Sequence, residues 1–459
     1  MARFGSRAAA SRRLRTITGM LVVLMMAASC TSGVNTAESS GPAGGSEAAA
    51  SGGAGGGGGS DTITIWFLDD TQEHIEPAIE RFNEEFPDIT VEAQAIENDP
   101  YKDQLQTAMG TEAAPDVFHT WGGGYLQQFV DADLVEPLDD YMAENTEWSD
   151  ALPEATLDAV TFDDAVYGVP AILGQVQMWY RTDIFEEHGL EPPATYDELL
   201  EVVTTLKEND VTPFTLANST RWPGAFWLIY LATRSGDPET FINAYNREEG
   251  VSFEDEAFVK AGERIQELVE MDAFVQGFNG LNYDTGESRA QLWSGDAAME
   301  LMGDWQYNTA LEEAPDVAEN SLDFFPFPAI EAPEGTGDAN TIVGGLNGAY
   351  SVSSNSGNVD ASKALVRYLT DTESAQAIID GSLGTPNITE GVEITDPIQQ
   401  RFVDAMAEAD NLQLYYDQFL PPELAEVHLD TTQELFGMST TPEEAASAVE
   451  SAAQDVLTE

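Results

Sequence analysis

An alternation of apolar strand-like runs and amphipathic helical segments starts at Thr62 and constrains the fold more than any other feature. Residues 62–67 form the first strand-like run, and a helix is predicted from Gln72, where Phe82 and Phe86 share one face. The same order repeats with a strand at 89–95, a helix at 99–109 and a strand at 116–118. Strands that alternate with helices predict an α/β fold whose parallel sheet carries helices on both faces.

The first 30 residues have the organisation of a secretory signal. A basic start ends at Arg15, an apolar run covers residues 20–28, and Ser29 and Cys30 follow. The apolar run is too short for a comfortable membrane span, so a signal peptide is predicted for residues 1–30. The sequence Ala-Ala-Ser-Cys at 27–30 resembles a bacterial lipobox with alanine at the usual leucine position. Cys30 is therefore predicted to be lipidated, and ordinary secretion with a free thiol is the alternative.

Residues 31–60 contain mainly Thr, Ser, Ala and Gly and close with five glycines at 55–59. Such a composition cannot bury a core, so a disordered tether is predicted. A tether of this length spans on the order of 30 Å root-mean-square, enough to hold a folded domain away from a membrane.

Charge excludes several classes of partner. The 459 residues include 82 Asp and Glu but only 18 Lys and Arg, for a formal net charge of −64. Binding to nucleic acid or to an anionic lipid surface needs a basic face, so neither is expected as a partner. The plain interpretation is a solvated acidic coat. A salty habitat is a hypothesis that predicts higher stability in molar salt than in dilute buffer.

No metal or cofactor site is predicted. There is one cysteine, so no intramolecular disulfide or multi-cysteine metal site can form, and the four histidines show no metal-ligand spacing. The Trp121-Gly-Gly-Gly segment lacks the lysine of a phosphate-binding loop, and no G-x-S-x-G nucleophile motif is present. Chance supplies many acidic pairs among 82 carboxylates, so a pair of acids is weak support for a glycosidase.

The segment SGDAAMELMGDW at 294–305 carries a family resemblance. Its core at 297–302 is expected to be buried, and Asp304 is expected to cap a helix that begins at Trp305. The segment resembles the G-x-A-A-M-x-x-x-G-x-W signature of extracytoplasmic solute-binding proteins of carbohydrate-uptake ABC transporters. Further blocks agree in order, namely PDVF at 115–118, YGVP at 167–170, WYRTDIF at 179–185 and GLEPPATYDEL at 189–199.

This resemblance implies a two-lobed periplasmic-binding-protein-like α/β fold with an interlobe cleft and several hinge crossings. Crossings are expected near Gly174, at Gly344-Gly345 and at residues 383–387. The predicted lobe 1 comprises residues 61–173 plus 347–384, and the predicted lobe 2 comprises residues 174–346 plus 385–459.

A carbohydrate site needs aromatic platforms for the CH faces of sugar rings, together with donors and acceptors for hydroxyl groups. Groups of this kind follow the predicted strands, where α/β folds place ligands. The predicted ligand-binding residues are Asp69, Asp70, Trp121, Gln175, Trp222, Asp304, Trp305, Gly345 and Asn347. Trp179 and Trp227 are predicted to be core residues, and whether Tyr415 and Tyr416 reach the cleft is left open.

The resemblance implies a lipid-anchored, monomeric receptor at the outer face of the cell membrane. It would capture a sugar or oligosaccharide by hinge closure and deliver it to the permease subunits of an ABC importer, without a cofactor and without catalysis. Two alternatives remain open. The tryptophans could form an aromatic cage for a quaternary-ammonium compatible solute, which the negative field would favour. The chain could also be a secreted glycoside hydrolase.

Overall fold

The computed structural model describes residues 62–457. The predicted signal peptide, Cys30 and the predicted tether therefore lie outside the described residues. Among the residues that are described, no helix is both long and apolar enough to cross a membrane.

The first three strands form the parallel arrangement that the alternation predicts. Strand β1 (Thr62–Leu68) pairs in parallel with β2 (Thr90–Ile96) on one side and with β3 (Val117–Thr120) on the other. Helices α1 (Gln72–Glu85) and α2 (Asn98–Ala108) make the crossovers, and α3 (Gly123–Asp131) follows β3. This unit turns the carboxyl ends of β1 and β3 toward the same edge of the sheet.

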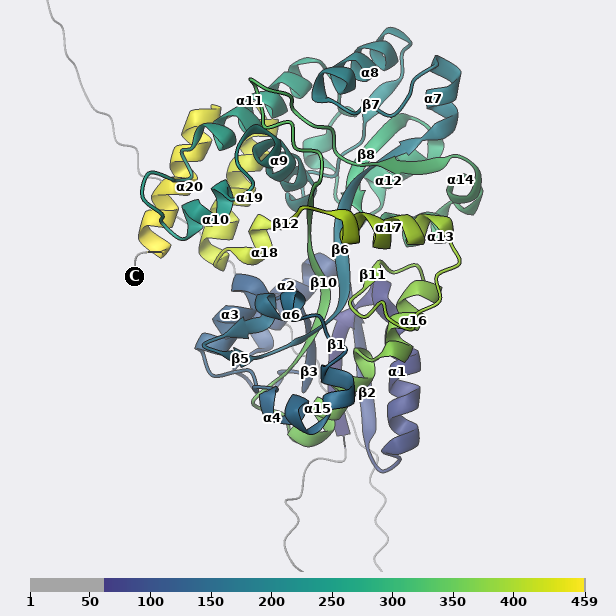
Figure 1. Cartoon of the computed structure of the whole chain (residues 1–459), viewed down its shortest axis with the longest axis vertical. Coiled ribbons are helices and arrows are strands. Elements are labelled where there is room, and N and C mark those ends of the chain that lie inside the picture. The colour runs from purple at the N-terminus through teal and green to yellow at the C-terminus, as the bar shows by residue number, and fades with distance from the viewer. Residues whose placement is uncertain (1–61, 458–459) are drawn as a thin grey trace, which may run out of the picture. The chain divides into compact units, whose positions relative to one another are not determined.

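Two long strands connect the halves of the molecule, and they run side by side in Figure 1. The first half of β6 (Val169–Arg181) pairs antiparallel with β10 (Thr341–Val352), and its second half pairs with β8 (Ala297–Gly303). The strand order is β2-β1-β3-β10-β6-β8-β7. Because β10 runs antiparallel to β3, the sheet as a whole is mixed, whereas the sequence predicted a parallel one.

The buried side chains separate into cores at the two ends of these strands. Two clusters contain Ile63, Phe118 and Ile172, and we call this part lobe 1. A larger cluster contains Val176, Trp227 and Met299, and we call this part lobe 2. Trp179 and Trp227 are both fully buried there, which confirms their prediction as core residues. The residue boundaries predicted for the two lobes stay a prediction.

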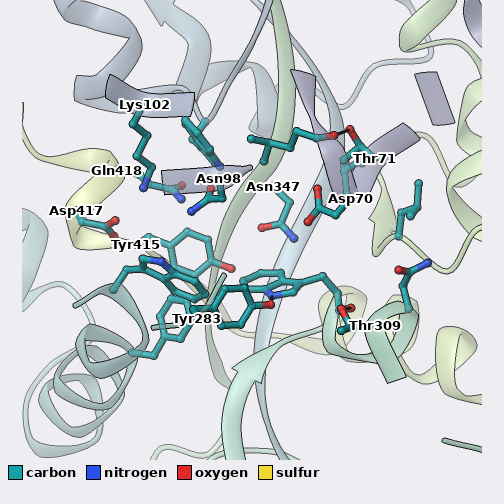
Figure 2. A pocket seen from close by; sticks show the side chains of 18 residues that line it. Asp70, Thr71, Asn98, Lys102, Tyr283, Thr309, Asn347, Tyr415, Asp417 and Gln418 are labelled. Carbon is teal, nitrogen blue, oxygen red and sulfur yellow. Dashed lines mark hydrogen bonds between the residues drawn. The ribbon is translucent and has the colours of Figure 1, made fainter. Parts of the chain in front are cut away.

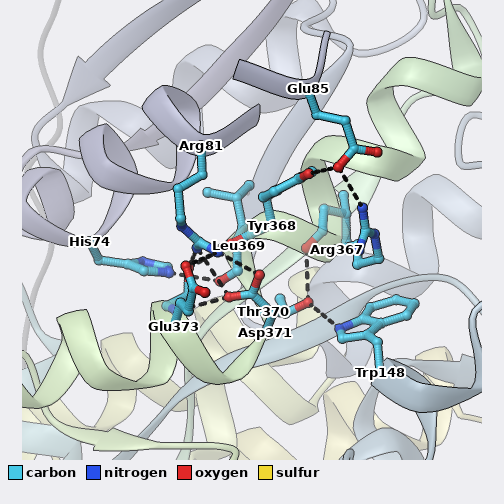
Figure 3. A network of polar contacts seen from close by, with 12 residues as sticks. His74, Arg81, Glu85, Trp148, Arg367, Tyr368, Leu369, Thr370, Asp371 and Glu373 are labelled. Atoms are coloured by element: carbon cyan, nitrogen blue, oxygen red, sulfur yellow. Dashed lines mark hydrogen bonds and ion pairs between the residues drawn. The ribbon is translucent and has the colours of Figure 1, made fainter. Parts of the chain in front are cut away.

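A polar network in lobe 1 joins its first helix to a segment that lies much later in the chain (Figure 3). Arg81 on α1 pairs with Asp371, with 2.6 Å between Nη1 and Oδ2, and its Nη2 donates to the carbonyl oxygen of Tyr368. The indole nitrogen of Trp148 donates to the Thr370 hydroxyl. The bonds of Arg81 join α1 to α15 (Val359–Leu369) and to the cap of α16 (Thr372–Asp380), nearly 300 residues further along the chain. The bond of Trp148 joins a second part of lobe 1 to the turn between the same two helices.

The other elements of lobe 1 are short. They are α4 (Asp139–Glu144), α5 (Thr146–Ser149), α6 (Glu154–Leu157), β4 (Thr161–Phe162) and β5 (Ala165–Val166). The third predicted crossing is occupied by β11 (Thr385–Pro386), which pairs with Ile172 and Leu173 of β6.

Lobe 2 surrounds β7 (Thr212–Phe214), β8 and β9 (Leu322–Phe325) with helices. Its first helices are α7 (Thr182–His188), α8 (Tyr196–Glu208), α9 (Trp222–Ser235), α10 (Thr240–Tyr245), α11 (Glu256–Glu270) and α12 (Glu287–Ser294). The others are α13 (Gln306–Glu313), α14 (Pro315–Asn320), α17 (Pro397–Glu408), α18 (Tyr416–Phe419), α19 (Pro422–Phe436) and α20 (Pro442–Val456), together with strand β12 (Asn411–Leu414).

Two details of lobe 2 bear on the sequence predictions. Thr195 followed by Glu198 three residues later predicts a capping box, and this box is present at the start of α8. The pattern of residues 283–293 predicts a helix from Tyr283, which is wrong at its start, because α12 begins only at Glu287, after Gly286 with φ of 74°. Tyr283 is consequently a loop residue.

Candidate functional site

A cavity of about 90 Å³ lies between the lobes, and Figure 2 shows its lining side chains. We call it the inner cavity. Its aromatic wall is formed by Trp121, Trp222, Phe226, Tyr283, Trp305 and Tyr415. Its polar groups are Asp70, Thr71, Asn98, Lys102, Asn308, Thr309, Asn347, Asp417 and Gln418. Lobe 1 supplies Asp70 and Trp121, whereas Trp222 and Trp305 belong to lobe 2, so a bound molecule would touch both.

Apart from Trp121, the rings of the aromatic wall belong to lobe 2 and form a connected cluster there. Trp222 packs against Tyr283 with ring centroids 4.6 Å apart and against Trp305 at 6.1 Å. The indole nitrogen of Trp305 donates to the Tyr283 hydroxyl over 2.9 Å. The Trp305 ring also lies against the backbone of Gly303, where an added Cβ would come within 2.0 Å of it. A residue without a side chain at 303 is therefore needed for this ring position.

A strained turn presents Trp222 at the start of α9. Arg221 has φ of 65° and ψ of −45°, and the Trp222 amide donates to the carbonyl oxygen of Thr220 over 2.8 Å. These values describe a γ-turn of the rare form with positive φ, which is strained for any residue with a side chain. Two ion pairs hold the Arg221 side chain. Its Nη1 lies 2.7 Å from Oε2 of Glu426 and 2.6 Å from Oδ1 of Asp430. Strain of this kind is common at binding sites.

A β-bulge presents Asn347. The pairing of β10 with β6 shifts register between Leu346 and Gly348, so Asn347 has no partner in the ladder. Bulges of this kind re-aim a side chain. The Asn347 amide occupies the space next to Gly174 of β6, where an added Cβ would lie 2.2 Å from Oδ1. The glycine at the predicted hinge thus makes room for a cavity-lining amide.

One buried polar atom of the wall, the hydroxyl oxygen of Tyr415, has no partner within residues 62–457, and that residue is 2% exposed. The indole nitrogen of Trp222, a residue that is 9% exposed, has no well-formed hydrogen bond there and makes only a weak contact with the Asp99 carboxylate. Leaving a buried polar group without a hydrogen bond costs about 1–3 kcal/mol. Both residues line the inner cavity, so a polar molecule in it can provide the missing partners.

Asp70 gives the cavity an acceptor whose charge depends on pH. Enclosure by the two lobes raises the pKa of Asp70 to about 7, and the negative charge of Asp69 contributes to the same rise. The side chain is still exposed to water in the cleft, which works against this shift. Its protonation therefore changes near neutral pH; the ionised form only accepts hydrogen bonds, whereas the protonated form also donates one.

The structure brings five of the predicted ligand-binding residues together. Asp70, Trp121, Trp222, Trp305 and Asn347 line the inner cavity. The other predicted residues lie close by but outside its wall. Asp69 is exposed beside Asp70, and Gly345 lines a small adjoining cavity with Trp121 and Tyr415. Gln175 is fully buried and donates to the carbonyl oxygen of Phe402 over 2.8 Å.

Asp304 is placed differently from its predicted role as a helix cap. Helix α13 starts at Gln306 with Trp305 in the cap position, and no side chain makes the capping bond. Asp304 is fully buried, and neither of its carboxylate oxygens has a well-formed hydrogen bond within the described part of the chain. Burial raises its pKa to about 8, against the opposing effect of nearby backbone amides. The Asp304 amide donates to the carbonyl oxygen of Gln175 over 2.9 Å, which continues the β8–β6 pairing by one residue.

Sequence reasoning missed several lining residues. Tyr283 was placed inside a helix, and Asn98, Lys102 and Gln418 carried no motif. Asn98 and Lys102 lie on the first turns of α2, which follows β2, so the strand-end rule applied to every strand would have found them. The sequence did not decide whether Tyr415 and Tyr416 reach the cleft. Tyr415 lines the cavity, whereas Tyr416 packs in the core of lobe 2, with its ring centroid 3.7 Å from that of Phe241.

A second depression continues from the inner cavity. We call it the outer groove, and its volume is about 630 Å³. Five residues line both spaces, namely Lys102, Trp121, Trp222, Asp417 and Gln418. Figure 2 shows Lys102, Asp417 and Gln418 at one end of the inner cavity and Asp70, Thr71 and Thr309 at the other, so the two spaces meet at one end only of this cluster. Across residues 62–457, no group of three acidic, histidine or cysteine side chains is arranged to hold a metal ion.

Comparison with known proteins agrees with this architecture. The sequence profile of the bacterial extracellular solute-binding protein family matches residues 67–376. An uncharacterised ABC transporter extracellular-binding protein of Pyrococcus horikoshii is 26% identical over 358 residues, or 75% of each chain. A solved structure from work on xylan utilisation by Caldanaerobius polysaccharolyticus is 28% identical, with a TM-score of 0.79 over 86% of this chain and all of the other.

A chitin oligosaccharide binding protein, 23% identical, has the same fold, with a TM-score of 0.78 over 87% of this chain and 99% of the other. The family and these neighbours are binding proteins rather than enzymes, so the alternative of a glycoside hydrolase is set aside. Their fold is the two-lobed one of periplasmic binding proteins, as predicted. The chain therefore belongs to the bacterial extracellular solute-binding protein family, as the extracytoplasmic, substrate-binding component of an ABC transporter.

Proposed function

We propose that this protein captures a neutral sugar or oligosaccharide between its lobes and presents it to the permease of an ABC importer. The observation that carries the proposal is the chemistry of the inner cavity. Aromatic rings from both lobes face it. The Tyr415 hydroxyl, which has no partner within residues 62–457, and the weakly bonded Trp222 indole nitrogen line it. Sugar rings offer apolar CH faces to such rings and hydroxyl groups to such polar atoms.

Capture by hinge closure fits the connections between the lobes. Strands β6 and β10 pass from one core to the other, and Gly174 and the Asn347 bulge lie on these connections. A ligand that touches both lobes has higher affinity for the closed form and so shifts the population toward it. The closed form is then the state that the permease recognises.

A monomer anchored through lipidated Cys30 and the tether at 31–60 completes the proposal. The Ala-Ala-Ser-Cys segment and the glycine run support it. The intact mass of protein extracted from membranes is expected to include an acyl adduct on Cys30, and an unmodified cysteine would contradict the anchor.

The aromatic-cage alternative has support from the same wall. Trp222, Tyr283 and Trp305 are in mutual contact, and Asp70 lies in the same cavity. A quaternary ammonium group, however, has no hydrogen-bond donor or acceptor, and a betaine adds only one carboxylate for the amides of Asn98, Asn308, Asn347 and Gln418 that line the rest of the cavity. These amides favour a molecule rich in hydroxyl groups.

A thermal-shift screen separates the two ligands. The full chain without its signal peptide is mixed with mono- and oligosaccharides in one arm and with glycine betaine in the other. A ligand at 100 times its Kd stabilises the folded state by about 2.7 kcal/mol, which raises Tm by several degrees. At least one saccharide is expected to give such a shift. A shift with betaine and with no saccharide would overturn the proposal in favour of the alternative.

Replacing Gly174 by alanine tests the placement of Asn347. The new Cβ would overlap the Asn347 amide, so we expect that side chain to leave its cavity position. Affinity for the best saccharide of the screen is expected to fall roughly tenfold, because about one or two hydrogen bonds are lost. Isothermal titration calorimetry measures the change.

Gly280→Ala is the matched control, since nothing lies within 4 Å of the position that its new methyl group would occupy, and its affinity should equal that of the native protein. Native affinity in Gly174→Ala would show that Asn347 does not contact the ligand.

A further inference from the structure

The cavity between the lobes does not end where one sugar ring would end. The inner cavity adjoins the outer groove, which has several times its volume, and the two share Lys102, Trp121, Trp222, Asp417 and Gln418. These shared residues come from both lobes. A ligand seated in the inner cavity and longer than this space would therefore extend past Trp121 and Trp222 into the groove.

The walls of the outer groove have the chemistry of the cavity rather than that of a random surface. Beyond the shared residues they add the ring of Tyr125 and the neutral polar side chains of Gln106, Gln128, Ser219 and Thr220. Tyr125 packs edge to face against Trp121 at 5.4 Å, so the aromatic wall is continuous from the cavity into the groove. Such a wall suits successive sugar rings, each with a CH face and hydroxyl groups.

The strained turn lies at the junction. The γ-turn at Arg221 fixes Trp222, a nine-tenths buried residue that lines both spaces and whose indole nitrogen makes only a weak contact with Asp99 of the groove wall. Ion pairs with Glu426 and Asp430 keep the Arg221 side chain at the groove wall. The fold thus places backbone strain at the point where a chain-like ligand would pass from cavity to groove.

The charged side chains of the outer groove restrict the charge of a ligand that can bind there. The groove is lined by Lys102 and Arg221 on the basic side, and the carboxylates that line it are Asp99, Asp103, Asp417, Glu423 and Glu426. Arg221 is already paired with acids, so an incoming anion would meet mainly negative charge. Uronic-acid and sulfated chains are therefore disfavoured.

We infer that the ligand is a neutral oligosaccharide, with one end in the inner cavity and the following rings in the outer groove, which thereby sets the preferred chain length. This inference rests on the proposed function, since it assumes that the inner cavity holds a sugar.

The test compares chain lengths by calorimetry on the full chain without its signal peptide. The probes form three series of one to five units, namely xylose with its β-1,4 oligomers, N-acetylglucosamine with its β-1,4 oligomers and glucose with its α-1,4 oligomers. Trigalacturonic acid is the anionic probe. In the series that binds, affinity is expected to rise at least tenfold from one unit to three, and trigalacturonic acid is expected not to bind.

Two variants locate the added affinity in the groove. Gln106→Ala combined with Gln128→Ala removes two amides of the groove wall and should weaken trisaccharide binding about five- to tenfold while changing monosaccharide binding less than twofold. Gln104→Ala combined with Gln127→Ala is the matched control on the same two helices, because neither residue lines the groove. Ser219→Trp, at an exposed position of the wall, should block the groove and weaken trisaccharide binding more than tenfold.

Each outcome decides the matter. Three results would overturn the inference and leave the proposed function intact. They are a monosaccharide that binds as tightly as its trimer, groove variants whose trisaccharide affinity equals that of their control, and tight binding of trigalacturonic acid. Binding of no saccharide of any length would instead overturn the proposed function itself.

Discussion

Trp305→Ala should weaken saccharide binding by roughly 30- to 100-fold, which corresponds to ~2–3 kcal/mol. The half-buried indole lines the inner cavity, contacts Trp222 and donates to the Tyr283 hydroxyl. Its removal takes away a stacking surface and also frees Tyr283 to move. Calorimetry with the best saccharide of the thermal-shift screen measures the loss, and near-UV circular dichroism verifies that the fold survives.

Trp293→Ala is the matched control for this substitution. Trp293 is also a half-buried tryptophan of lobe 2, but its indole nitrogen donates to Glu313 and its ring is not part of the cavity wall. The Trp293→Ala protein should therefore bind the saccharide with native affinity. A folded Trp305→Ala protein with native affinity would remove Trp305 from the site.

Asp304→Asn should stabilise the protein at alkaline pH and reduce the dependence of its stability on pH. An unfolded aspartate has a pKa of about 3.9, whereas burial raises the pKa of Asp304 to about 8. Between these values the folded protein retains a proton that the unfolded chain has lost. The free energy of unfolding therefore decreases as pH rises from about 4 to about 8, and the native protein is least stable, with respect to this group, at and above pH 8.

The neutral amide removes this contribution, so the gain in Tm over the native protein should grow with pH and reach roughly 5 °C at pH 8. Thermal melts from pH 5 to pH 8.5 at constant ionic strength measure it. The quantity to follow is the difference in Tm between the variant and the native protein. Burial also raises the pKa of Glu300 and of Asp70 to about 7, and their contribution cancels in this difference. Asp296→Asn, at an exposed position just before β8, is the control. A constant difference across this pH range would show that Asp304 does not titrate there.

Part of the fold could be predicted because its signals are local. The alternation from Thr62 predicts β1, α1, β2, α2 and β3, and the structure has these elements within one or two residues. The capping box at Thr195 and Glu198 involves residues three apart, so its geometry is contained in the sequence. Tyr283 was assigned wrongly for the same reason, since the apolar pattern of residues 283–293 resembles a helix and only Gly286 breaks it.

The site could be predicted in part, because the strand-end rule locates Asp70, Trp121 and Trp305 without knowledge of their neighbours. It does not tell a side chain that lines the cavity from one that packs beneath it. Asp304 obeys the same rule, and Gln175 is predicted from its place just past the hinge at Gly174, yet both are fully buried. Core packing decides which of these side chains is covered, because every residue of β8 is buried and no alternation marks an inward face.

The sequence by itself determined the strand and helix order, the tryptophans available for a sugar and the family, because these depend on short-range periodicity and on motifs. Only the tertiary structure decided that Asn347 occupies the space beside Gly174, that Tyr283 meets Trp305, and that the cavity continues into a groove. The physical reason is that each of these contacts joins residues well separated in the chain, whose approach is fixed by sheet register and core packing rather than by local preference.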